Sequence, residues 1–233
     1  MKTHLLVYFC LPLILLLSPR QGYAQREIIP VDWDGLKALV KKDPDHVKEL
    51  IKTLSAPTID KDFPYRDRII AFYGQSLLTE DSEEYLVEEM EDLRAEGKWS
   101  EVLSKAEAIL KINPLNIDAL YEAAISINKL RGEGNTTRTH EEGQIYYNRM
   151  MRLFNVIAYT GYGNRKYPFY VTKVSDEYNF LRHYLNIWEY SGQSLVDNCD
   201  LIKLNESSEY YSSPEIYFEA SRPLEIETAA LFF

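Results

Sequence analysis

One cysteine and one histidine in the C-terminal third are the residues best suited to nucleophilic chemistry. Cys199 could supply a thiolate and His183 its base, with Asp176 or Asp200 orienting the imidazole. Such a hydrolase needs the base within about 3 Å of the thiol and a third group that fixes the ring. The alternative is an inert buried thiol, which slow alkylation of Cys199 at neutral pH would indicate.

Other catalytic and cofactor motifs are missing from the sequence. There is no G-x-S-x-G elbow, and neither G-x-x-x-x-G-K-[ST] nor G-x-G-x-x-G is present. His46, His140 and His183 are far apart and lack a ligand partner at helical spacing, which argues against zinc. Adjacent acids such as Glu83-Glu84 diverge by about 100° on a helix, so we interpret them as solvated faces. No cofactor and no metal are therefore expected.

Tyrosine is concentrated in the later part of the chain, where twelve of the 18 tyrosines lie between Tyr146 and Tyr217. Tyr and Trp give a large contact area at low entropic cost, so an aromatic patch could bind a peptide or a glycan. The alternative is that these rings pack at the edge of a small core with their hydroxyls in water. The candidate binding positions are Tyr167, Tyr170, Tyr210 and Tyr211.

The N-terminus has the three parts of a cleavable export signal. Lys2 carries the positive charge, residues 5–17 are apolar, and small residues precede a cut before Gln25. The 13-residue apolar run contains Pro12 and is shorter than the roughly 20 residues that span a bilayer. We expect residues 1–24 to be removed, no membrane span to remain, and the protein to be periplasmic, envelope-associated or secreted. A retained anchor is the alternative.

The charge balance is acidic. Removal of two basic residues with the signal leaves 24 basic and 36 acidic residues, a formal charge of about −12. Binding to nucleic acid requires clustered Lys and Arg, so nucleic acid is not an expected partner. The one remaining cysteine, Cys199, cannot form an intramolecular disulfide, so the stability must come from the core.

Residues 25–163 are predicted to form a helical, repeat-like domain. Apolar residues recur at three- and four-residue spacing from about Asp32 to Tyr159. The pattern is interrupted at Asp43-Pro44 and again over residues 55–64, which contain two prolines. Short breaks of this kind are typical of helices that pack against their neighbours in the chain.

Residues 83–130 resemble a tetratricopeptide repeat. Gly97 and Pro114 fall at the turn positions of this helix-turn-helix unit of about 34 residues. Val102 and Ile109 depart from the pattern, since small residues are usual there. An ordinary helical hairpin is the alternative. The residues that stacked helix pairs would bury in one cluster include Trp99, Ala106 and Ala123.

Residues 164–233 are predicted to form a small α+β tail packed on the helices. Tyr167 to Lys173 is aromatic and β-branched and predicts a strand. Two more strands are expected over Ser194 to Leu204 and over Glu215 to Ala220, joined by a long loop.

One helix is expected between the first two of these strands. Ser175 is its candidate N-cap, and its apolar face would include Phe180 and Trp188. The predicted fold class is therefore α+β and mainly α, with tetratricopeptide-like hairpins followed by a small C-terminal antiparallel sheet with one helix.

Several short motifs follow one another along the chain: Phe72-Tyr73-Gly74, Asp176-Glu177-Tyr178, Gln193-Ser194-Leu195, Cys199-Asp200 and Ile216-Tyr217-Phe218. Their order resembles that in a family of exported proteins from Gram-negative gut anaerobes, classed as a domain of unknown function. The likeness covers most of residues 30–224 and implies periplasmic or outer-envelope residence and a helical-plus-sheet fold. It implies no catalytic residue or ligand.

Taken together, these features favour an exported, non-enzymatic module that binds a protein or peptide partner. The binding surface would be the concave face of the helices or the aromatic surface of the tail. The alternatives are a hydrolase that uses Cys199 and His183, and a glycan-binding protein that uses the tail tyrosines.

Overall fold

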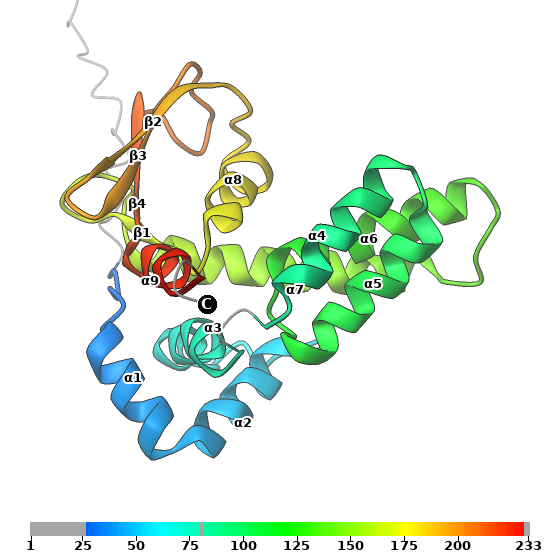
Figure 1. The fold of residues 1–233 in the computed structure, drawn as a ribbon, viewed down its shortest axis with the longest axis horizontal. Coiled ribbons are helices and arrows are strands. Elements are labelled where there is room, and N and C mark those ends of the chain that lie inside the picture. The colour runs from blue at the N-terminus through cyan, green and yellow to red at the C-terminus, as the bar shows by residue number, and fades with distance from the viewer. Residues whose placement is uncertain (1–26, 80–81, 231–233) are drawn as a thin grey trace, which may run out of the picture.

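Helices make up most of the chain, and a small sheet is formed by its C-terminal part (Figure 1). The computed structural model describes residues 27–79 and 82–230, so the predicted signal peptide lies outside the described part. The predicted mainly helical α+β class is confirmed. In chain order the elements are α1 (Trp33–Lys42), α2 (Pro44–Ser55), α3 (Tyr65–Thr79), α4 (Glu84–Ala95), α5 (Trp99–Ile112), α6 (Ile117–Gly132), α7 (His140–Thr160), β1 (Phe169–Tyr170), α8 (Val174–His183), β2 (Tyr190–Val196), β3 (Cys199–Leu204), β4 (Glu215–Glu219) and α9 (Ser221–Ala230).

The first two helices are separated by the predicted break at Asp43-Pro44. Asp32 caps α1 by accepting a hydrogen bond from the Gly35 amide at 3.0 Å, and Asp43 caps α2 by accepting one from the His46 amide at 3.1 Å. Pro44 lies in the first turn of α2, where no helical hydrogen bond needs its missing N–H. Local polar signals therefore set both helix starts.

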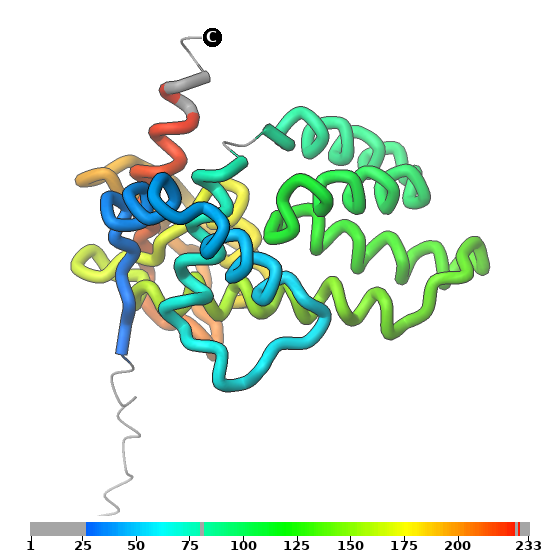
Figure 2. Tube along the Cα trace, turned by 90° about the horizontal axis from the view of Figure 1, so that it is seen from below, coloured from blue at the N-terminus to red at the C-terminus, as the bar shows by residue number. Residues whose placement is uncertain are grey.

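The tetratricopeptide-like stretch forms successive helix pairs, which Figure 2 shows as rows on one side of the molecule. Gly97 has a φ of 74°, in the left-handed region, and so permits the tight turn between α4 and α5. Asn116 caps α6 by accepting an amide hydrogen bond at 2.9 Å. Trp99, Ala106 and Ala123 belong to one apolar cluster, as predicted. The small side chains let neighbouring helices approach closely.

The longest helix, α7, joins this cluster to the rest of the molecule. Thr139 and Glu142 form a capping box at its start, with reciprocal hydrogen bonds of 3.2 and 2.7 Å. Its early part packs against α6, and its later part enters a larger core with α3 and β1. Although α7 has 21 residues, no helix of the described part is long and apolar enough to cross a membrane.

The sheet has the strand order β1-β4-β3-β2. The β3–β4 pair is antiparallel, as predicted, and β2 pairs with β3 in the same way, whereas β1 pairs with β4 in parallel, so the sheet is mixed. The single strand predicted over residues 194–204 is wrong, because Asp197 and Asn198 make a tight turn inside it. Both residues have positive φ, 51° and 60°, which suits a two-residue hairpin turn.

Two further elements differ from the prediction. The helix α8 ends at His183, and Asn186 has a left-handed φ of 54°, so Trp188 is not on the helix. The N-cap of α8 is Lys173, not Ser175, which lies in the first turn. The C-terminal helix α9 has no counterpart among the predicted elements.

Four phenylalanines form the centre of the larger core. The Phe180 ring on α8 lies 5.9 Å from Phe154 on α7, 5.0 Å from Phe169 on β1 and 6.1 Å from Phe218 on β4, measured between ring centroids. All four are buried, and such tilted or edge-on pairs add to the hydrophobic stabilisation. Residues on both sides of position 163 therefore share one core.

Gly161, at the end of α7, provides a stability test. A Cβ atom there would lie only 2.0 Å from the Pro168 carbonyl oxygen, a backbone atom that cannot move alone. We expect Gly161→Ala to lower the free energy of unfolding by about 3 kcal/mol, the upper end for overpacking. Urea titration measures this. Gly192→Ala is the control, since no atom lies within 4 Å of its Cβ position, and an equal loss in both variants would contradict the prediction.

Candidate functional site

A groove with a cavity volume of about 290 Å³ lies where α4, α6 and α8 meet. Side chains on one helix face are three or four residues apart, so each helix presents a short row to the groove. The loop after α8 adds one residue. The groove is lined by Met90, Glu91 and Arg94 of α4, Asp118, Tyr121 and Glu122 of α6, Ser175, Tyr178, Asn179, Arg182 and His183 of α8, and Trp188. We call it the α4–α6–α8 groove.

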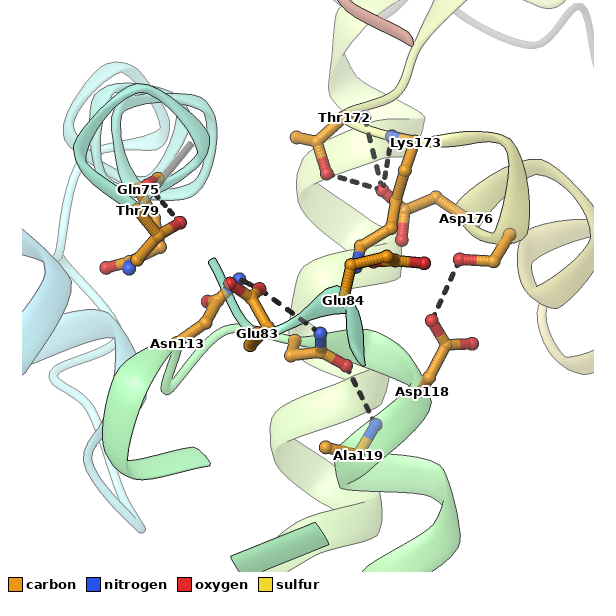
Figure 3. Close-up of polar contacts among 12 residues, drawn as sticks. Gln75, Thr79, Glu83, Glu84, Asn113, Asp118, Ala119, Thr172, Lys173 and Asp176 are labelled. Carbon is orange, nitrogen blue, oxygen red and sulfur yellow. Dashed lines mark hydrogen bonds and ion pairs between the residues drawn. The ribbon is translucent and has the colours of Figure 1, made fainter. Parts of the chain in front are cut away.

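Asp118 ties two walls of this groove together. Its carboxylate accepts one hydrogen bond from the Ser175 hydroxyl at 2.8 Å, the dashed line at Asp118 in Figure 3. It accepts another from the Asn179 side-chain amide at 2.6 Å. Because both carboxylate oxygens are engaged by α8, the spacing between α6 and α8 is fixed.

Glu122 is the most deeply buried acid of the groove, with 5% of its surface exposed. One carboxylate oxygen lies 3.3 Å from the Arg94 guanidinium, and the other accepts from no donor in the described part of the chain. Burial raises the pKa of this carboxyl to about 6, although the nearby Arg94 opposes the shift. An acid with one unsatisfied oxygen is costly to bury and is suited to receiving a donor from a ligand.

Aromatic rings form the other end of the groove. Tyr121 stacks on His183 with ring centroids 4.3 Å apart, and Trp188 meets the same imidazole edge-on at 5.8 Å. Burial lowers the pKa of His183, with a further contribution from Arg182, so the imidazole is neutral at pH 7. The Trp188 side chain is 56% exposed, which is unusual for so large an apolar group.

A second polar cluster is buried between α3, the start of α4, the α5–α6 turn and α8, and Figure 3 shows its side chains converging. The interpretation of Glu83 as part of a solvated face is wrong, because this residue is fully buried and accepts a hydrogen bond from the Asn113 amide at 2.5 Å. Asp176 accepts from the amide and hydroxyl of Thr172 at 3.1 and 2.7 Å. The cavity beside these residues, about 10 Å³, has room for roughly one water molecule. Because this cavity is too small for a larger ligand, we interpret the second polar cluster as structural.

The four tyrosines predicted as a binding surface lie outside the groove. Tyr211 is half-buried, and its hydroxyl lies 2.8 Å from the Gly163 carbonyl oxygen. Tyr167 and Tyr170 are also half-buried, the first with its ring edge-on to Tyr162. Tyr210 is 62% exposed and is the most exposed of the four.

The structure does not bring Cys199 and His183 together. Cys199 pairs with Val196 at the turn of the β2–β3 hairpin, whereas His183 contacts Trp188 beyond its other end. The length of β2 separates the two ends by roughly 20 Å. Burial also raises the pKa of the Cys199 thiol, with further contributions from nearby carboxylates such as Glu219. The candidate orienting acid Asp176 is engaged by Thr172.

The groove residues on α6 are absent from the sequence-based candidates. Their signal was the spacing of Asp118, Tyr121 and Glu122, which gives α6 a second face opposite its alanine-rich one. Trp188 was assigned to a helix face, but it lies in the loop after α8 and is exposed. Within the described residues, no group of three or more His, Cys, Asp or Glu side chains could hold a metal ion.

The chain belongs to the family described as Domain of unknown function (DUF4919), whose model matches residues 71–229. All the residues that line the α4–α6–α8 groove fall within this range. The predicted membership of a family of unknown function is confirmed to this extent. No curated protein and no solved structure matches the chain.

The buried Glu122 carboxyl predicts a pH dependence of stability. Its pKa is about 6 in the folded state and near 4.5 when unfolded, so the folded state binds more protons between these values. The free energy of unfolding should therefore fall by roughly 1–2 kcal/mol as the pH rises from 4.5 to 6.5, after allowance for partial screening.

Glu122→Gln isolates this contribution from that of Asp176, whose pKa burial also raises to about 6. The difference in unfolding free energy between the two proteins, measured by urea titration across this pH range, should follow the Glu122 titration. A difference that does not change with pH would contradict the assignment.

Proposed function

We propose that the protein is an exported, non-enzymatic module that holds a segment of a partner protein in the α4–α6–α8 groove. The observation that carries this proposal is the exposed Trp188 at the edge of a groove that also presents two tyrosines and two arginines. Trp, Tyr and Arg are the residue types that dominate binding hot spots. A side chain from a partner would cover the Trp188 ring and remove its apolar surface from water.

The groove also has the rigidity that binding requires. Asp118 fixes α6 against α8, and the stacked Tyr121 and His183 rings fill the space behind Trp188. A preformed surface loses less conformational entropy on binding than a mobile one. The polar groups along the walls, among them Asn179 and Arg182, provide hydrogen bonds that orient the bound segment.

The arrangement of titratable groups supports binding over catalysis. A cysteine hydrolase requires a base close to its thiol, and Cys199 and His183 lie at opposite ends of the β2–β3 hairpin. Export, and residence in the periplasm or the cell envelope of a Gram-negative bacterium, are further parts of the proposal. They are supported by the charge and hydropathy of residues 1–24 and by the family resemblance.

Binding to the groove is tested with random short peptides displayed on phage and selected against the purified protein. For the selected peptides, fluorescence anisotropy should show that Trp188→Ala weakens binding by about 30-fold, the loss typical of a hot-spot residue. Tyr210→Ala is the matched control because it removes an exposed ring outside the groove, and it should change the affinity by less than about threefold.

Two results would refute the proposal. One is that no peptide is selected. The other is that Tyr210→Ala abolishes binding while Trp188→Ala does not, which would move the binding surface to the tail tyrosines.

A further inference from the structure

The strand β2 forms an open edge of the sheet. Within the described residues it pairs only with β3, and most of its side chains are exposed, Leu195 by 55%. Its sequence, YSGQSLV, contains no charged residue and no proline. Natural proteins protect edge strands with lysine, proline or bulges, because an open edge offers unpaired backbone groups to another chain. The irregularity of β2 lies between Tyr190 and Gly192, so residues 193–196 remain unprotected.

The hairpin geometry identifies the backbone groups that face outwards. In a hairpin with a two-residue turn, the residues next to the turn form a hydrogen-bonded pair, here Val196 and Cys199. Hydrogen-bonded pairs alternate along the ladder, so Ser194 and Leu201 form the next one. The N–H and C=O groups of Gln193 and Leu195 therefore point away from β3. They are available to an added strand.

This edge is continuous with the α4–α6–α8 groove. The Tyr178 ring, which lines the groove, lies 5.4 Å from the Tyr190 ring of β2. The Tyr178 hydroxyl also donates a hydrogen bond to the Gln193 side chain. A strand that pairs with residues 193–195 and runs past Tyr190 would reach Trp188 and the groove.

Charge distinguishes between the possible occupants of this edge. Two copies of the chain carry the same formal charge of −10 and so repel one another. The groove presents Glu91, Asp118 and Glu122. Against these three acids stand two arginines, Arg182 and Arg94, of which Arg94 pairs with Glu122, so the acidic side chains of the groove outnumber the basic ones by one. The formal charge of −10 of the whole chain further favours a basic partner.

We infer that β2 receives an extended, basic segment of a partner protein as an added strand, and that a Lys or Arg side chain of this segment enters the α4–α6–α8 groove. Backbone hydrogen bonds along β2 would supply affinity, and the acids of the groove would supply the preference for a basic side chain. The inference rests on the proposed function, and it names the mode of binding and the chemistry of the partner.

The test uses the phage-selected peptides and two variants of one residue. Leu195→Pro removes the outward N–H, which an edge strand tolerates, and should weaken binding by about tenfold, the worth of one backbone hydrogen bond. Leu195→Thr keeps that N–H and shortens the side chain, so it should stay within about threefold of the wild type. The peptides should be enriched in Lys and Arg, and added salt should weaken their binding.

A second measurement keeps the test valid if Leu195→Pro unfolds. In the wild-type protein, hydrogen exchange at the Gln193 and Leu195 amides should slow when a selected peptide is bound. Unchanged exchange at both amides would overturn the inference, as would peptides without basic residues. If Trp188→Ala still abolishes binding in that case, the proposed groove function stands and strand addition alone fails. The inference would also be overturned if the free protein self-associates and Leu195→Pro abolishes this self-association. That result would assign the β2 edge to a second copy of the chain.

Discussion

The position of α8 is the constraint on which the rest of the structure depends. Its Phe180 is fully buried and packs on Phe154, Phe169 and Phe218, so the helix is held simultaneously against α7 and the sheet. Loss of one such ring from a core costs about 3–5 kcal/mol, a large part of the stability of a typical domain. The other side of α8 is then free to face α6. The groove is a consequence of this division, because α8 cannot approach α6 more closely without leaving its aromatic core.

Polar contacts act together with the apolar core to fix the position of α8. Asp118 reaches α8 from α6, and Lys173, at the start of α8, lies 3.0 Å from Glu84 at the start of α4. The fully buried Glu83 is costly to remove from water and is compensated only in part by Asn113. Such groups add less stability than an apolar core, but they tolerate few alternative arrangements. They fix the angle between the helix pairs and α8, and with it the shape of the groove.

The elements that sequence reasoning located correctly are those with local signals. Asp43-Pro44 and Gly97 act within one turn of the chain, through a capping carboxylate and a left-handed φ, and both breaks are where they were expected. The parallel pairing of β1 with β4 joins Phe169 to Phe218, and no local pattern specifies so distant a partner. The turn at Asp197-Asn198 was missed because Asp-Asn is a weaker hairpin signal than Asn-Gly or Asp-Gly.

The groove itself was predictable only in part. The spacing of Asp118 and Glu122 shows that they share a face of α6, but a solvated helix face has the same spacing. These two acids differ from those of a solvated face in having partner side chains that are distant in the sequence. Asn179, the partner of Asp118, is 61 residues away, and Arg94, the partner of Glu122, lies on a different helix. The end of α8 before Trp188 was equally hard to predict, because the left-handed Asn186 follows the helix and asparagine permits that conformation without requiring it.

Two of the three acids of the groove, Asp118 and Glu122, could also be considered as the pair of a glycosidase, and the contacts of Asp118 argue against that use. Such an enzyme needs one protonated acid and one carboxylate that is free to attack the sugar or to activate water. Glu122, with its pKa near 6, could serve as the acid. Both oxygens of Asp118, however, are occupied by hydrogen bonds from Ser175 and Asn179. Loss of either hydrogen bond would remove one of these two links between α6 and α8, so the contacts of Asp118 favour a structural role over that of nucleophile or base.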